Sequence, residues 1–135
     1  MYTQKKILII EDEEFQRKAI HDYLKQKDFA IFEAADGIEG IEMALRIRPD
    51  VILLDVRMPK MDGMTMMHNL RKDPWGKNAA IIILTNYDTN DIQLLQITND
   101  HPSYYLIKAN SPLKDIFEKI EELIELKQKE EKPTE

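Results

Sequence analysis

The chain has 135 residues, 43% of them hydrophobic and 33% charged, which is the size and composition of one globular domain. Its formal net charge of -6 argues against non-specific nucleic-acid binding, which needs clustered cations on phosphates. The absence of cysteine excludes disulfides, thiolate zinc sites and thiol catalysis. The longest apolar run, residues 79–84, is too short to span a bilayer, and the N-terminus lacks the apolar core of a secretory signal. We therefore expect a cytoplasmic protein.

The first half of the chain alternates short apolar runs with segments of helical period. The runs 7–10 and 51–54 predict strands buried on both faces, because continuous apolar runs are typical of parallel sheets that helices cover on both sides. The run 30–34 predicts a weaker strand nearer a sheet edge. Two helical stripes separate these strands: Phe15, Ala19, Ile20, Tyr23 and Leu24 form the first, and Ile38, Ile41, Ala44 and Leu45 form the second.

The second half of the chain continues this alternation. The pattern predicts a short helix over 64–70, a buried strand over 80–84, a weak helix over 92–98, an edge strand over 104–107 and a clear helix over 113–124. We expect one domain over residues 1–127 and a polar C-terminal tail over 128–135. Five strands alternating with five helices, joined by right-handed crossovers, predict an α/β fold with a doubly wound parallel sheet.

Polar residues follow four of the five predicted strands, at the edge where ligands bind in such sheets. Glu11 and Asp12 follow the first strand, Asp55 the third, Thr85 the fourth and Lys108 the fifth. Two carboxylates about 4 Å apart repel by roughly 4 kcal/mol at an effective dielectric of about 20, so several acids in one crevice need a cation or a shared proton. Lys108 supplies one positive charge, and a hard divalent cation such as Mg²⁺ would supply the rest. A carboxylate in that setting can act as a nucleophile toward a phosphoryl group.

Each of these residues also has a structural interpretation when it is taken alone. Asp55 is consistent with a turn former, and the acidic pair with a first helical turn that the helix dipole favours. Thr85 and Lys108 are consistent with a turn residue and a solvated lysine. The joint placement of these groups at one sheet edge favours a phosphoryl or metal site over these separate interpretations.

The stretch 53–63, which contains Asp55 in the pattern Asp-x-x-Met-Pro-x-Met-Asp-Gly, resembles the phosphorylation segment of response-regulator receiver domains. The other four site residues match the family's invariant positions in order, and the similarity covers nearly the whole chain. The resemblance implies a flavodoxin-like (βα)5 fold with strand order 2-1-3-4-5. It further implies a stand-alone, single-domain regulator similar to the chemotaxis regulators.

The resemblance also implies roles for individual residues. Asp55 would accept a phosphoryl group from a phosphohistidine on a sensor histidine kinase or a phosphotransfer protein. Asp12, Asp55 and the backbone carbonyl of Arg57 would bind Mg²⁺ or Mn²⁺ directly, and Glu11 would hold the metal through water. Lys108 would pair with Asp55 and then with the phosphoryl oxygens.

The implied function is a phosphorylation-dependent signalling switch of a two-component system or phosphorelay. Thr85 would move toward the phosphoryl group and let the aromatic ring of Tyr105 turn inward. This change would reshape the face formed by the fourth helix, fifth strand and fifth helix, where a downstream protein target would bind. The protein would catalyse only its own phosphorylation and dephosphorylation, without direct contact to nucleic acid or membrane.

Two departures from the family pattern affect the expected site. The family usually has proline after the lysine, whereas here Lys108 is followed by Ala109, so a trans peptide bond is expected there. Arg57 and Tyr87 occupy the variable positions that modulate the reaction rates, and both are bulky enough to shield an acyl phosphate from water. We expect slow self-dephosphorylation, and a half-life of seconds would contradict this expectation.

Two other functions remain open on the sequence alone. An aspartyl-nucleophile phosphatase similar to the haloacid dehalogenase group also places aspartate after a buried strand, but its second aspartate is replaced here by Arg57. A binding module with the receiver fold that is never phosphorylated is supported only by the missing proline. Turnover of a phosphate ester would favour the first, and failure to bind Mg²⁺ would favour the second.

Overall fold

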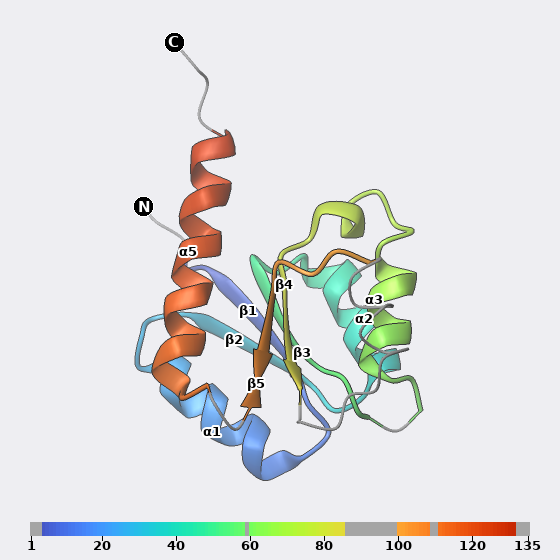
Figure 1. Cartoon of the computed structure of the whole chain (residues 1–135), viewed down its shortest axis with the longest axis horizontal. Coiled ribbons are helices and arrows are strands. Elements are labelled where there is room, and N and C mark those ends of the chain that lie inside the picture. Colours follow the sequence, from blue (N-terminus) through green and yellow to red (C-terminus); the bar gives the residue numbers. More distant parts are fainter. Residues whose placement is uncertain (1–3, 59, 86–99, 109–110, 132–135) are drawn as a thin grey trace.

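The computed structural model describes residues 4–58, 60–85, 100–108 and 111–131 (Figure 1). Five strands form one parallel sheet in the order β2-β1-β3-β4-β5, which confirms the expected fold. The strands are β1 (Lys6–Ile10), β2 (Ala30–Ala34), β3 (Val51–Asp55), β4 (Ile81–Thr85) and β5 (Tyr104–Ile107). The weak helix expected over 92–98 lies outside the described residues. Among the described helices, none is long and apolar enough to cross a membrane.

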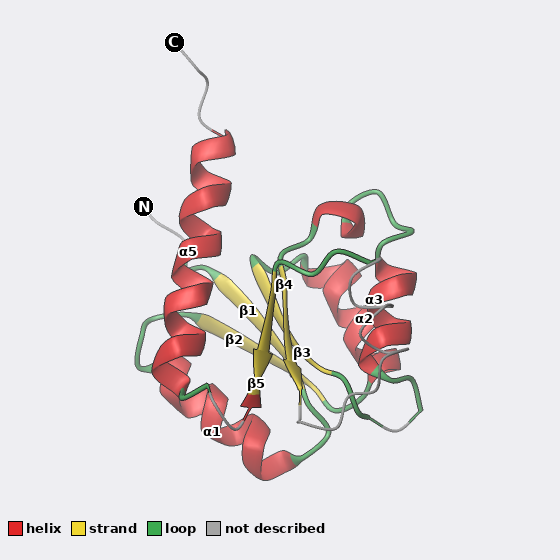
Figure 2. Cartoon of the chain, viewed as in Figure 1, coloured by secondary structure: helices red, strands yellow, loops and turns green. Residues whose placement is uncertain are grey.

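Helices cover both faces of the sheet (Figure 2). The helical elements are α1 (Glu14–Lys25), α2 (Gly37–Ile47), α3 (Gly63–Leu70), the 3-10 turn η1 (Gly76–Asn78) and α5 (Leu113–Glu131). α1 and α5 pack on one face, and α2 and α3 pack on the other. The molecule therefore has three layers, with the sheet in the middle.

The strands alternate their side chains between two apolar cores. In β1, Ile7 and Ile9 belong to the core under α1 and α5, whereas Leu8 and Ile10 belong to the core under α2 and α3. β3 and β4 are buried along their whole length, while β2 and β5 are partly exposed at the two sheet edges. These findings confirm the assignment of the continuous apolar runs to central strands.

The apolar stripe expected on α1 is only partly buried. Ile20 and Leu24 lie in the core, but Ala19 is exposed and Phe15 is 83% exposed. The first turn of α1 extends past the carboxyl ends of the strands (Figure 1). Phe15 is therefore exposed although it belongs to the predicted stripe, because helical period identifies a face but not where the sheet beneath it ends.

The stripe expected on α2 is also only partly correct. Ile38 and Leu45 are 44% and 38% exposed, and the buried residues are Gly37, Gly40 and Ala44. The small side chains let α2 approach the sheet closely, since a Cβ at Gly40 would lie 2.8 Å from the Cδ1 atom of Ile10. Ile38 and Leu45 are left on the outer part of the helix, whereas Ile41 packs against the core.

The last helix is longer than expected. α5 continues to Glu131, so residues 128–131 of the expected polar tail are helical. Ile116 and Ile120 are buried in the core, which confirms the apolar stripe of this helix. Glutamate and lysine are good helix formers, and this explains why the helix extends beyond its last core contact.

Arg71 ties the end of α3 to two later segments. Its half-buried guanidinium donates to the main-chain oxygens of Gly76 and Ala79, each at 2.8 Å. It also donates to the main-chain oxygens of Asp100 and His101, each at 2.9 Å. This side chain therefore holds in place the segments that lead into β4 and β5. These segments lie at the edge of the sheet opposite the strand ends that carry the polar residues.

The start of α3 is fixed directly against the end of β3. The carboxylate of Asp62 caps the helix by accepting a hydrogen bond from Thr65 N at 2.8 Å. The N–H group of Gly63 donates to Val56 O at 2.9 Å. A Cβ on Gly63 would collide with the main-chain carbonyl of Asp55, so only glycine permits this approach.

We expect Gly63→Ala to lower the free energy of unfolding by about 1–3 kcal/mol. The added Cβ would meet main-chain atoms of Asp55, which cannot move aside as a side chain can. Gly40→Ala is the matched control, since its Cβ would meet side-chain atoms of Ile10 rather than main-chain atoms. Alanine is also favoured over glycine within a helix by about 1 kcal/mol. Urea unfolding measures both variants, and equal losses would contradict this account.

Candidate functional site

The residues predicted at the strand ends converge at the carboxyl edge of the sheet. Glu11 directly follows β1, Asp55 ends β3, Thr85 ends β4 and Lys108 directly follows β5. Glu11, Asp55 and Thr85 are 3%, 6% and 2% exposed, so these polar groups are held inside the molecule. The strand order produces this arrangement, because it places β1 and β4 on either side of β3.

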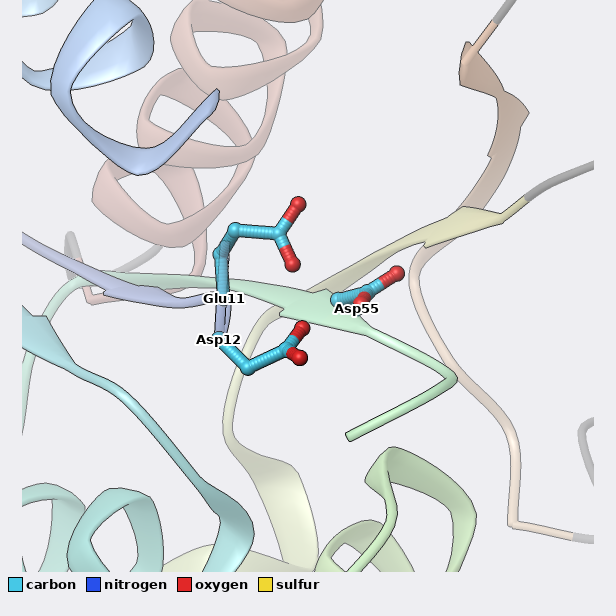
Figure 3. A group of neighbouring side chains, drawn as sticks. All are labelled: Glu11, Asp12 and Asp55. Atoms are coloured by element: carbon cyan, nitrogen blue, oxygen red, sulfur yellow. The ribbon is translucent and has the colours of Figure 1, made fainter. Parts of the chain in front are cut away.

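Three carboxylates share one small region of this edge. Glu11, Asp12 and Asp55 each offer an oxygen atom, and these three atoms all lie within 4.8 Å of one another. In Figure 3 the side chains of Glu11 and Asp12 extend from the end of β1 toward Asp55 at the end of β3. Glu11 and Asp55 are buried, whereas Asp12 is exposed, so the cluster opens to solvent on the side of Asp12.

Lys108 supplies the positive charge next to this cluster. Its Nζ atom lies 2.8 Å from Glu11 Oε1 and 3.0 Å from Asp55 Oδ1. The lysine side chain is 20% exposed, so both ion pairs are largely shielded from water. This confirms the expected pairing of Lys108 with Asp55 and adds Glu11 as a second partner.

The charge states of the site follow from burial and mutual contact. Burial raises the pKa of Glu11 to about 8, and a hydrogen bond to Asp55 acts in the same direction, while Lys108 opposes it. Burial alone would lower the pKa of Lys108, but its contacts with Glu11 and Asp55 raise it above the ordinary value. Burial therefore favours a proton on the Glu11 carboxyl group of the metal-free site, beside the Lys108 ammonium.

Two further side chains of α1 contact the site, and sequence reasoning missed both. Gln16 Oε1 accepts a hydrogen bond from Lys108 Nζ at 3.0 Å. Arg17 Nη1 donates to the main-chain oxygen of Glu11 at 2.8 Å, and its Nε atom pairs with Glu33 Oε1 at 3.2 Å. Both residues lie just after Glu11 and Asp12, on the polar side of the predicted helix. Side chains there are usually expected to be exposed to solvent.

The donor set fits a divalent cation. Three carboxylates and one ammonium leave an excess of two negative charges when every acid is ionised. A cation of charge +2 would offset that excess, and carboxylate oxygens with an open side for water suit Mg²⁺ or Mn²⁺. The acidic residues Glu11, Asp12 and Asp55 are therefore the residues that could hold the metal.

The remaining predicted residues are only partly covered by the described structure. Thr85 is buried at the end of β4, and Tyr105 is half-buried in β5 beside the core under α2 and α3. Arg57 is exposed two residues beyond Asp55. Tyr87 and Ala109 lie outside the described residues, so the expected rate effect of the first and the peptide geometry at the second stay predictions.

Curated relatives match part of this chain and are longer proteins. The transcriptional regulatory protein ResD from Bacillus subtilis is 34% identical over 112 residues, which are 82% of this chain and 44% of ResD. The response regulator PleD from Caulobacter vibrioides is 35% identical over 83 residues, which are 62% of this chain and 18% of PleD. This chain thus spans less than half the length of these relatives.

Solved receiver structures superpose on nearly the whole chain. The receiver domain of AraT from Geobacillus stearothermophilus is 30% identical, with a TM-score of 0.81 over 96% of this chain and 100% of that one. The receiver domain of the sensor histidine kinase PA1611 from Pseudomonas aeruginosa is 25% identical, with a TM-score of 0.82 over 91% and 99% of the two chains. That structure has a magnesium ion coordinated in its active site cleft. Residues 7–121 match the family described as response regulator receiver domain, and the chain therefore belongs to this family of two-component systems.

Proposed function

We propose that the chain is a phosphorylation-dependent signalling switch with Asp55 as its phosphoacceptor. The observation that carries this proposal is the position of the Asp55 carboxylate, which is buried, 3.0 Å from the Lys108 ammonium and within the acidic cluster. A carboxylate held next to a fixed cation is prepared for attack on a phosphoryl group, because the charge that develops there already has a partner.

The proposed step transfers a phosphoryl group from a phosphohistidine. An Oδ atom of Asp55 forms a bond to phosphorus while the phosphorus–nitrogen bond breaks, and the bonding electron pair stays on the histidine nitrogen. Lys108 stabilises the charge on the phosphoryl oxygens. Mg²⁺ held by Asp12 and Asp55, with Glu11 and the main-chain carbonyl of Arg57 as further donors, would neutralise more of that charge.

The comparisons support the partners that this proposal needs. One similar receiver domain is part of a sensor histidine kinase, and other relatives are named transcriptional regulators. We infer a sensor histidine kinase or a phosphotransfer protein as the phosphoryl donor, and a protein as the target. The magnesium ion in the PA1611 receiver domain supports Mg²⁺ as the cofactor here.

The proposed switch connects Asp55 to the β5 edge of the sheet. Thr85 and Tyr105 lie on neighbouring strands, where Thr85 pairs with Ile107 and Tyr105 pairs with Ile83. A movement of Thr85 toward the phosphoryl group would change the space next to β5, and the half-buried Tyr105 ring could then move inward. The target would bind the face of β5 and α5, together with the fourth helix expected outside the described residues.

The assignment of Asp55 as the phosphoacceptor predicts a gain in mass that is lost when its carboxylate is replaced by an amide. Incubation with acetyl phosphate and Mg²⁺ is expected to add one phosphoryl group to the wild type and none to Asp55→Asn, as read by intact mass. Asp22→Asn, which alters an exposed acid on α1, is the matched control and is expected to behave as the wild type. An equal gain in Asp55→Asn would contradict the assignment. A wild type that neither gains a phosphoryl group nor binds Mg²⁺ would favour the unphosphorylated binding module.

The raised pKa of Glu11 predicts pH-dependent Mg²⁺ binding. In the metal-free protein the proton stays on Glu11 up to a pH of about 8, and the metal must displace it. The apparent Mg²⁺ affinity is therefore expected to rise by up to about tenfold per pH unit toward pH 8 and to level off above it. Calorimetry at several pH values measures this slope. Glu11→Gln is expected to flatten it, and a flat wild-type profile between pH 6 and 9 would contradict the prediction.

A further inference from the structure

Lys108 has all of its hydrogen-bond donors engaged in the unphosphorylated protein. A lysine ammonium carries three N–H donors. Here its Nζ atom contacts Glu11 Oε1 at 2.8 Å, Asp55 Oδ1 at 3.0 Å and Gln16 Oε1 at 3.0 Å. An oxygen of a phosphoryl group on Asp55 can therefore bond to the ammonium only by replacing one of these three acceptors.

The Gln16 side chain is oriented for this contact from its other end. Its Nε2 group donates to Glu13 Oε2 at 2.8 Å, so the amide oxygen faces Lys108. Gln16 and Lys108 also line a cavity of about 440 Å³ together with Ser111 and several apolar side chains of α1 and α5. This cavity gives the Gln16 amide room to turn when the ammonium moves away.

Gln16 is an uncharged acceptor for the Lys108 ammonium. Hydrogen bonds to ionised acceptors are roughly twice as strong as those to neutral ones, and the Gln16 amide is neutral at every pH. A phosphoryl group carries a charge of about -1.5 to -2 at neutral pH. Its oxygens therefore compete well with the Gln16 amide for the ammonium.

We propose that Gln16 is a positioning residue that occupies the third donor of Lys108 while Asp55 is unphosphorylated and releases it to a phosphoryl oxygen. This inference rests on the proposed function of Asp55. Gln16 stabilises the unphosphorylated state, because the contact has to break before Lys108 can serve the phosphoryl group. The residue thereby sets how readily the protein gains its phosphoryl group.

The test compares three variants at this position in the full chain, with acetyl phosphate and Mg²⁺ as the probe. Gln16→Leu leaves the third donor to water, and we expect the initial phosphorylation rate to rise about threefold to tenfold. Gln16→Asn keeps the amide but is one methylene shorter, and we expect it to behave like Gln16→Leu. Gln16→Glu offers a charged acceptor, and we expect the rate to fall by at least the same factor.

Two controls separate this role from a general effect on α1. Gln26→Leu and Gln26→Glu make the same changes at the exposed C-terminal end of α1 and are expected to leave the rate unchanged. The ¹H–¹⁵N signal of the Lys108 ammonium, recorded by NMR in the unphosphorylated protein, is expected to shift in Gln16→Leu and not in Gln26→Leu. Urea unfolding shows whether each variant is folded.

The outcomes distinguish this inference from the function on which it rests. A wild type that cannot be phosphorylated on Asp55 overturns the proposed function, and the role of Gln16 with it. A phosphorylated wild type, with rates that are unchanged or reduced in both Gln16→Leu and Gln16→Asn, overturns only the role of Gln16. Opposite changes in Gln16→Leu and Gln16→Glu support it, because a purely structural residue would lower the rate in both.

Discussion

A single ammonium group shared by two buried carboxylates is the interaction on which the site depends. Lys108 is separated from Glu11 by 97 positions in the sequence, yet Lys108 Nζ and Glu11 Oε1 lie 2.8 Å apart. The pair forms only when β1, β3, β4 and β5 lie in their observed order, because each strand delivers its polar group at its carboxyl end. Burying these acids without Lys108 would leave uncompensated charge in a region of low dielectric. The site therefore needs this strand order to bring its charged groups together, and the fold needs Lys108 to offset the charge of the buried acids.

The apolar layers allow this charged edge to be rigid. Both faces of β3 and β4 are covered, so the main chain that carries Asp55 and Thr85 has little freedom to move. α3 adds a second restraint, since Gly63 lies directly against the carbonyl of Asp55. The side that stays accessible is the one where Asp12 is exposed, which is where a metal and a phosphoryl donor would have to enter. A group-transfer site needs a rigid main chain that carries its reactive group and one side that is open to its substrates.

Much of the fold and the central site residues could be predicted because their signals are local. Continuous apolar runs identify the central strands, and polar residues at strand ends identify the edge where they meet. The exposure of Phe15, Ile38 and Leu45 could not be predicted in this way, since periodicity does not say how closely a helix approaches its sheet. The contact between Gln16 and Lys108 joins residues 92 positions apart, and a glutamine on a polar helix face carries no sign of such a partner.

Arg71 has a consequence for how this protein can vary. Its contacts with Gly76, Ala79, Asp100 and His101 are all made to main-chain oxygens. Every residue type carries that oxygen, so these four contacts place no demand on the identity of the side chains they hold. Gly76 is constrained for another reason, since an added Cβ there would collide with the main-chain oxygen of Leu70, but substitutions at the other three positions leave these contacts in place as long as the backbone path is kept. Arg71 itself has no such freedom, because no other side chain presents five donors in one planar fork. Sequence change in these two segments therefore depends on one guanidinium rather than on matched pairs of changes.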